Sequence, residues 1–150
     1  MNPGMYSSAT GEWETPLWLY RTLDDSFSFD WDLAANATNS QCGPRYYGPD
    51  SVYGEDSLTQ HWATMRCWLN PPYGREIGKW VQKAWVESQK GATVVVLLPA
   101  RTDTRWWHDW VGGKALVVFL KGRLKFGGAE NSAPFPSAIA IYLPPLVEPK

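Results

Sequence analysis

The residues best suited to chemistry form one short turn, Asn70-Pro71-Pro72-Tyr73. An apolar run, residues 67–69, leads into it. Two consecutive prolines fix the backbone and cannot continue a helix or an inner strand. A turn between a strand and a helix lies at the carboxyl edge of a sheet, where α/β proteins place their sites.

This turn combines two hydrogen-bond acceptors with an aromatic ring. An exocyclic amine on adenine is a poor nucleophile, because its lone pair is delocalised into the ring. The Asn70 side-chain oxygen and the Pro71 carbonyl can accept its two hydrogens and favour a localised lone pair. Tyr73 can stack on the base, a gain of about 1–3 kcal/mol. The turn therefore predicts a site that holds an amino group during methyl transfer, with no general base required if the proton leaves afterwards.

A strand before the turn and a helix after it must position these groups. Residues 66–69 are predicted as a short strand. Residues 75–90 are the clearest helix, because apolar residues recur at i, i+3, i+4, i+7 and i+8 from Ile77, and Gly91 ends it. Residues 93–98 are apolar on both faces, as in a buried parallel strand.

The remaining chain alternates strands and helices. We expect Thr15 to cap a helix and Pro16 to begin it. Residues 36–59 read as a long functional loop with at most one short strand. The alternation predicts an α/β fold with a mostly parallel sheet and antiparallel C-terminal strands. Strands are further expected at 27–33, 115–120 (buried), 124–126 and 138–143, and a short helix at 103–111.

The length and the charge distribution limit the function. A chain of 150 residues is most simply one domain, and we expect a flexible tail over 1–12 and a single domain over 13–145. The net charge of −1 conceals nine acids and two bases in residues 1–65, against twelve bases and six acids in residues 66–150. This asymmetry is typical of a protein with a cationic ligand and a polyanionic partner, although ordinary surface variation produces it too.

Cys42 and Cys67 are too few and too isolated for a disulfide framework or a zinc site, and we expect no metal. No apolar run approaches the ~20 residues that span a bilayer. The polar start, residues 1–11, differs from a signal peptide. We therefore expect a soluble, cytoplasmic protein without a membrane partner.

The ordered motifs of this chain resemble the phage DNA N6-adenine methyltransferases, the Dam-like family, over about residues 13–143. Asn-Pro-Pro-Tyr is a signature of amino-methyltransferases that use S-adenosylmethionine. The resemblance implies a compact Rossmann-like class I methyltransferase fold, double-stranded DNA as substrate, a flipped-out adenine and a role such as restriction-modification; we expect a monomer or weak dimer. The motifs are Thr15-Pro16, 29–35, Tyr46-Tyr47, Asp56 before Trp62, 70–74, 98–102, 122–126 and 134–137.

The resemblance assigns the cofactor to the acidic first half. Thr15 and Pro16 match a threonine–proline pair that holds the methionine end. Asp56 matches by position the acid that receives the cofactor's adenine amino group. The expected strand end supplies acids for the cationic cofactor and a small residue for its close approach to the backbone: Asp30, Asp32 and Ala34.

One departure concerns the Gly-x-Gly turn of many methyltransferases. It is absent after Leu33, where Ala-Ala-Asn-Ala stands instead. Fewer residues separate Asp32 from Asp56 than a full helix–strand–helix needs. The cofactor half is therefore trimmed, and Asn36 and Asn39 are the candidates for its ribose.

The basic second half is the expected DNA side. Basic groups interleaved with aromatic rings suit phosphate contacts and stacking. Phe135, between two prolines, is the candidate for the second face of a base sandwich, while the loops 36–60 and 127–137 would read the site. The candidate phosphate ligands are Arg101, Arg105, Arg123 and Lys125.

Two other functions share this turn. Methyltransferases of a glutamine side chain in release factors also carry Asn-Pro-Pro-Tyr, because a planar amide nitrogen poses the same chemical problem. The missing glycine-rich turn and the basic second half disfavour that alternative. A catalytically inactive DNA-binding module with a methyltransferase-like fold is the second alternative, which the trimmed cofactor half favours.

Overall fold

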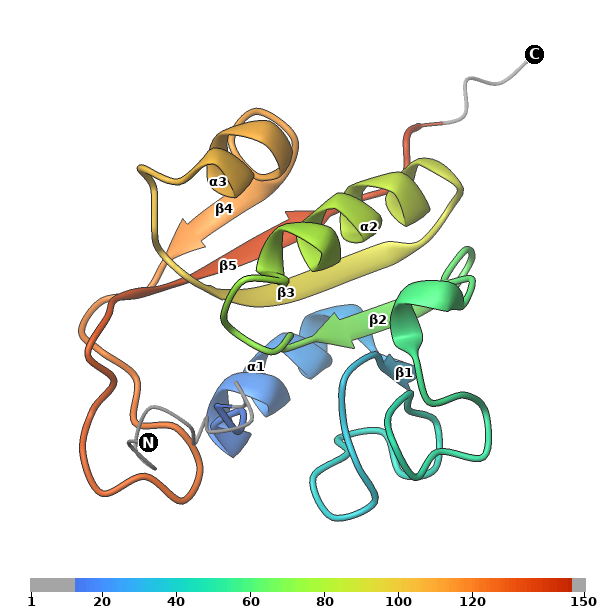
Figure 1. Cartoon of the computed structure of the whole chain (residues 1–150), viewed down its shortest axis with the longest axis horizontal. Coiled ribbons are helices and arrows are strands. Elements are labelled where there is room, and N and C mark those ends of the chain that lie inside the picture. The colour runs from blue at the N-terminus through green and yellow to red at the C-terminus, as the bar shows by residue number, and fades with distance from the viewer. Residues whose placement is uncertain (1–12, 147–150) are drawn as a thin grey trace.

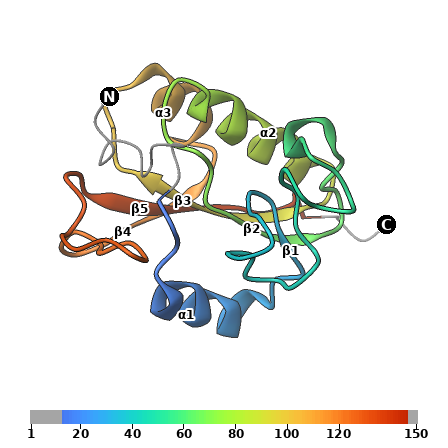
Figure 2. The same ribbon diagram turned by 60° about the horizontal axis from the view of Figure 1, so that its bottom comes forward.

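A five-stranded sheet lies at the centre of residues 13–146, the part of the chain that the structure, a computed structural model, describes. The strands are β1 (Trp31–Asp32), β2 (Arg66–Leu69), β3 (Thr93–Pro99), β4 (Leu116–Phe119) and β5 (Ser137–Tyr142). The helices are α1 (Leu17–Phe27), α2 (Ile77–Gln89) and α3 (Arg105–Trp110), with a 3-10 turn η2 (Ser57–Thr59). Helix α1 covers one face of the sheet, and α2 and α3 cover the other (Figures 1 and 2).

Two expectations from the sequence concern the tail and the membrane. The flexible tail expected at 1–12 lies outside the described residues. None of the helices between residues 13 and 146 is long and apolar enough to cross a membrane.

The sheet has the strand order β1-β2-β3-β5-β4. Strands β1, β2 and β3 pair in parallel. Strand β5 pairs antiparallel with both β3 and β4, so β4 runs in the same direction as β3. The expected α/β class is therefore confirmed, and the sheet is mixed: two strand pairs are parallel and the two that involve β5 are antiparallel. The carboxyl ends of β1 to β4 all lie at one edge.

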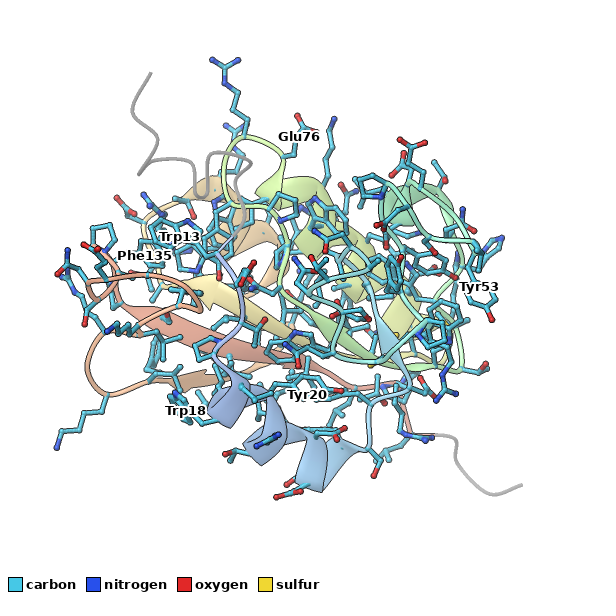
Figure 3. The ribbon with its side chains drawn as sticks, turned by 90° about the horizontal axis from the view of Figure 1, so that it is seen from below. Trp13, Trp18, Tyr20, Tyr53, Glu76 and Phe135 are labelled. Atoms are coloured by element: carbon cyan, nitrogen blue, oxygen red, sulfur yellow. The ribbon has the colours of Figure 1, made fainter. Side chains whose placement is uncertain are left out.

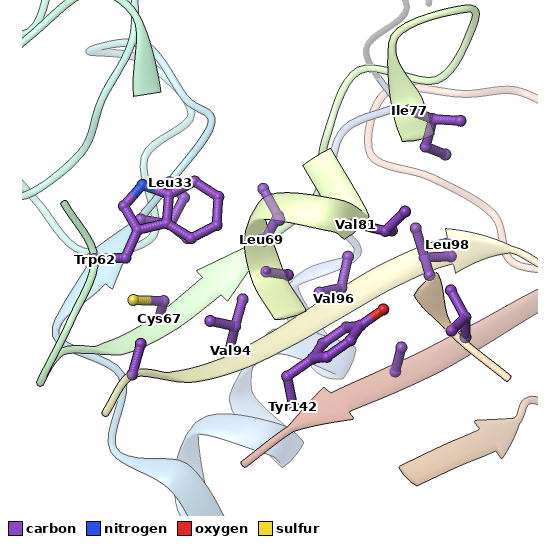
Figure 4. Close-up of a cluster of buried hydrophobic side chains, with 14 of the residues drawn as sticks. Leu33, Trp62, Cys67, Leu69, Ile77, Val81, Val94, Val96, Leu98 and Tyr142 are labelled. Carbon is purple, nitrogen blue, oxygen red and sulfur yellow. The ribbon is translucent and has the colours of Figure 1, made fainter. Parts of the chain in front are cut away.

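Strand β3 carries the core on both faces, as its apolar run predicted. Val94, Val96 and Leu98 are fully buried on the side of α2 and α3; Figure 4 shows Val96 and Leu98 near Val81 of α2, and Val94 near Cys67 of β2. Val95 and Leu97 are fully buried in the cluster on the α1 side. This alternation follows from the two-residue period of a strand.

The strand expected at 27–33 is wrong over most of its length. Helix α1 continues to Phe27, and Ser28 then adopts a left-handed conformation (φ 52°). The Phe29 amide donates to the Asp24 carboxylate at 2.8 Å, which holds the turn. Only Trp31–Asp32 pairs with β2.

The predictions for the second half contained two errors. Residues 124–126 form no strand; Leu124 and Phe126 are buried on the α1 side of the sheet instead. Strand β4 is present but is not buried, since Leu116 and Phe119 are 61% and 63% exposed. The physical reason is its position: β5 takes the inner place, and β4 forms the edge of the sheet.

The long connection between β1 and β2 is held by a buried carboxylate. Glu87 of α2 is 1% exposed and accepts a hydrogen bond from the Trp62 amide at 2.5 Å. Lys83 and Lys90 lie 3.9 and 3.3 Å from its oxygens. Burial raises the pKa of Glu87, but the amide and the two ammonium groups outweigh burial and the pKa lies below its usual value.

We predict that Glu87→Ala lowers the free energy of unfolding by about 3 kcal/mol at pH 7, because it leaves the buried Trp62 amide without an acceptor. A lowered pKa in the folded state stabilises the fold above the unfolded pKa, so the difference from wild type should shrink below about pH 4. Urea unfolding at both pH values measures it. The control is Glu76→Ala, whose exposed carboxylate contacts only Lys79 and should change stability by less than about 0.5 kcal/mol. Equal effects of the two variants would contradict this account.

Candidate active site

The turn that follows β2 holds the Asn70 amide in one orientation. The Asn70 Nδ2 group donates to the Trp13 carbonyl and, at 3.1 Å, to the Thr15 hydroxyl. A carbonyl only accepts hydrogen bonds, so the nitrogen must face Trp13 and the oxygen must face away. Asn70 Oδ1 is buried and has no hydrogen-bond partner among residues 13–146. A buried acceptor without a donor is costly, which marks this oxygen as a contact for a ligand.

Thr15 was expected to cap α1, but it does not. The N-cap is Pro16, and no side chain bonds to the first turn of the helix. The Thr15 hydroxyl instead accepts from Asn70 Nδ2 and from the Trp68 indole N–H, which lies 3.3 Å away. Both partners are pure donors here, so the hydroxyl hydrogen is left for another acceptor.

A cavity of about 320 Å³ adjoins the turn. It brings together Thr15, Asp32, Ala34 and Asn70, which come from three separate stretches of sequence. The loop 38–41 forms its remaining polar wall. Three residues assigned to the cofactor by resemblance therefore meet beside the amide of the turn.

Two carboxylates line this cavity: Glu14 is exposed, whereas Asp32 is buried and only 3% exposed. Its two oxygens accept from the amides of Ala34 at 3.3 Å and Gln41 at 3.0 Å. Among the described residues, none forms an ion pair with it. Burial raises the pKa of Asp32 to about 7, although the two amides oppose the rise. A cationic ligand would stabilise the ionised carboxylate.

Other residues proposed for the cofactor lie outside this cavity. Asp30 accepts from the Arg66 amide at 2.8 Å, at the opposite end of β2 from the turn. Asp56 is exposed and caps η2 by accepting from the Leu58 amide at 3.0 Å. Pro16 is buried and does not line the cavity.

Of the two candidates for the ribose, Asn39 lines the cavity and Asn36 does not. The Asn36 side-chain oxygen accepts from Thr38 and Asn39 within its own loop. Its function in this structure is therefore to shape the loop.

Tyr73 is anchored by its hydroxyl, which donates to the Leu97 carbonyl at 3.0 Å. Burial raises the pKa of Tyr73 well above its usual value, so the hydroxyl stays a donor. Its ring meets the Phe135 ring edge to face, with centroids 5.7 Å apart. Phe135 also packs against Trp13, beside which it lies in Figure 3. A base sandwich between Tyr73 and Phe135 requires these two rings to separate.

The basic candidates are all exposed, and one of them lies at the turn. The Arg101 guanidinium lies over the Phe135 ring, 5.7 Å from its centroid. A second hollow, of about 430 Å³, opens beside it between the loops after β2 and β3. Arg75 lines this hollow and was missed from the sequence, although it follows the turn directly. The other exposed basic candidates are Arg105, Arg123 and Lys125.

The α/β fold with its mixed sheet, and a polar cavity at the end of β2, are compatible with a methyltransferase. Residues 5–143 match the family described as DNA N-6-adenine-methyltransferase (Dam). The chain belongs to this family of DNA N6-adenine methyltransferases.

Two relatives carry the same description, "DNA N-6-adenine-methyltransferase". The protein of Haemophilus phage HP1 (strain HP1c1) is 29% identical over 123 residues, which cover 79% of this chain and 68% of the relative. The protein of Escherichia phage T1 is 27% identical over 114 residues, which cover 75% of this chain but only 45% of the relative. The resemblance to the phage Dam-like family is confirmed.

We predict that Asp32 destabilises the ligand-free protein at high pH. Its pKa is raised from 3.8 to about 7, so its favourable contribution is complete below the unfolded pKa and is lost as pH rises through 7. The loss is at most about 4 kcal/mol. Urea unfolding at pH 5 and pH 8 should show a smaller decline for Asp32→Asn than for wild type. The exposed Asp25→Asn is the control, and a decline as large in Asp32→Asn as in wild type would contradict the assignment.

Proposed function

We propose that this protein transfers a methyl group from S-adenosylmethionine to the N6 amino group of adenine in double-stranded DNA. The observation that carries the proposal is Asn70 Oδ1, a buried acceptor that no donor within residues 13–146 reaches and whose orientation is set from behind by Trp13 and Thr15. Membership of the Dam family supports adenine in DNA as the target.

The chain's own part in the reaction is to hold the amino group. Asn70 Oδ1 and the Pro71 carbonyl accept one N6 hydrogen each, and Pro72 keeps the two acceptors in fixed relation. Among residues 13–146, none donates a hydrogen bond to the Pro71 carbonyl. These acceptors stabilise the positive charge that develops on N6 as its bond to the methyl carbon forms. The proton then leaves N6 for water, so no side chain has to act as a base.

The cavity beside the turn fits the cofactor by its chemistry. S-adenosylmethionine supplies a methyl group on a sulfonium and leaves as S-adenosylhomocysteine. The buried Asp32 carboxylate suits its cationic sulfonium and ammonium groups, and Thr15 has a hydroxyl hydrogen free for an acceptor. Ala34, with its small side chain, lets a ligand approach the strand end. Asp30 and Asp56 have no part in this cavity.

The target base must leave the duplex to reach Asn70. Tyr73 is the stacking surface, held in place through Leu97. Phe135 moves away from Tyr73 to admit the base. Arg101 lies over the Phe135 ring and binds the DNA phosphates. Arg105, Arg123 and Lys125 add exposed positive charge.

We expect wild-type protein to transfer labelled methyl groups from S-adenosylmethionine to adenine-containing duplex DNA, with N6-methyladenine as the nucleoside product. Asn70→Ala should abolish transfer, a loss of at least about 100-fold. The same variant should remain folded and should still bind S-adenosylmethionine in calorimetry, although the loss of the Asn70 donors to Trp13 and Thr15 lowers its unfolding midpoint.

Three results would contradict this function. They are full activity of Asn70→Ala, transfer to a glutamine side chain of a protein instead of DNA, and no binding of S-adenosylmethionine by wild type. The last would favour the inactive DNA-binding module.

Thr15 is predicted to be a positioning residue that acts through Asn70. Thr15→Val removes the acceptor of the Asn70 and Trp68 donors, so the amide loses part of its orientation and kcat should fall about tenfold. Thr15→Ser keeps the hydroxyl and should restore most of kcat. A structural role alone would lower the unfolding midpoint of Thr15→Val and leave kcat per folded molecule unchanged, which is the contrary result.

A further inference from the structure

The hollow of about 430 Å³ lies on the other side of the turn from the cofactor cavity. Tyr73, Gly74 and Arg75 line it from the loop after β2, and Pro99 and Arg101 line it from the loop after β3. It shares no lining residue with the cavity that contains Asn70 and Asp32. Because the cavity beside Asn70 is assigned to the cofactor, this separate hollow is available to another ligand.

The two charged side chains that line this hollow, Arg75 and Arg101, are both positive. Arg75 and Arg101 are exposed, and neither forms an ion pair within residues 13–146. No carboxylate lines the hollow. The nearest acid in the sequence, Glu76, points outward in Figure 3 and is paired with Lys79 at 2.6 Å. Two unpaired guanidinium groups beside one hollow suit a phosphate oxygen pair.

The backbone and the walls favour a larger group than phosphate alone. Gly74 has φ 145°, and a Cβ atom added there would meet nothing within 4 Å, so a ligand can approach the chain closely. Trp106, Ile77 and Pro99 form an apolar wall. An indole ring beside a cationic rim suits a sugar or base that is attached to the phosphate.

The geometry points to a subsite for the nucleotide that adjoins the target adenine on the same strand. Arg75 and Arg101 bind the phosphate between the two nucleotides, and Trp106 contacts the sugar or base of the neighbour. Tyr73 lines this hollow and belongs to the turn that holds N6, so one residue spans the target and its neighbour. This inference rests on the proposed function, because it takes the base at the turn to be adenine in DNA.

Replacement of one DNA phosphate by an uncharged linkage tests the subsite. The probe is a fluorescent duplex that wild type methylates, prepared with its natural phosphates or with one methylphosphonate next to the target adenine, on either side in turn. Fluorescence anisotropy over 50–300 mM NaCl gives the affinity and its salt dependence for wild type, Arg75→Gln, Arg101→Gln and Trp106→Leu. Arg21→Gln, an exposed arginine on α1, is the matched control, and thermal unfolding checks every variant.

The expected result is specific to one linkage. Arg75→Gln and Arg101→Gln should each weaken binding several-fold, and each should reduce the slope of log K against log salt by no more than about 1, because they share one phosphate. On the duplex with the neutral linkage at the bound position, wild type should lose at least the factor that either variant loses on the natural duplex, and Arg75→Gln should bind this duplex as tightly as wild type does. Trp106→Leu should weaken binding at every salt concentration with the slope unchanged, and Arg21→Gln should match wild type.

Two kinds of failure can be told apart. If methyl transfer to DNA occurs but the arginine variants keep wild-type slopes, or lose the same factor on every duplex, the subsite is wrong and the proposed function stands. If no DNA is methylated, the probe cannot be chosen, and both the function and the subsite that rests on it are overturned.

Discussion

The interaction on which the site depends is the pair of hydrogen bonds from one side-chain amide, that of Asn70, to the Trp13 carbonyl and the Thr15 hydroxyl. An amide whose nitrogen is held must present its oxygen in a fixed direction. The segment that holds it is tied in turn to the loop before β5, because the Gly127 amide donates to the Glu14 carbonyl at 2.9 Å. Residues 13–15, Asn70 and Gly127 are distant in sequence, and together they hold the Asn70 side-chain oxygen in place.

The parts of this protein that could be predicted from its sequence are those decided locally. Strand β2 was predicted with its observed bounds, and α2 and β3 within two residues, because their apolar periodicity is strong and uninterrupted. The turn follows β2 directly, so its place at the sheet edge followed as well. The partner of Thr15, by contrast, depends on a contact across fifty-five residues. The same holds for the exposure of β4, which is decided by where β5 inserts.

The trimmed cofactor half has a structural equivalent for the absent glycine-rich turn. After β1 the chain bends through the loop 36–41, in which the side-chain oxygens of Asn36 and Asn39 accept backbone amides. This bend brings the Gln41 amide to the Asp32 carboxylate. Asparagine side chains, which readily bond to nearby backbone, thus provide the fold of a short loop where glycines would provide backbone freedom.

The place of β5 in the sheet governs the order in which this chain can assemble. Strand β5 is synthesised after β3 and β4, yet it lies between them and supplies backbone partners to both. Until residues 137–142 emerge from a ribosome, β4 has no neighbour in the sheet and the long inner edge of β3 is open. Because such distant pairings form late and slowly, the half-made sheet exposes an apolar strand edge of the kind that associates with other chains. The rate at which residues 137–142 are synthesised, and the chaperones that bind the unfinished sheet, therefore affect the yield of folded protein.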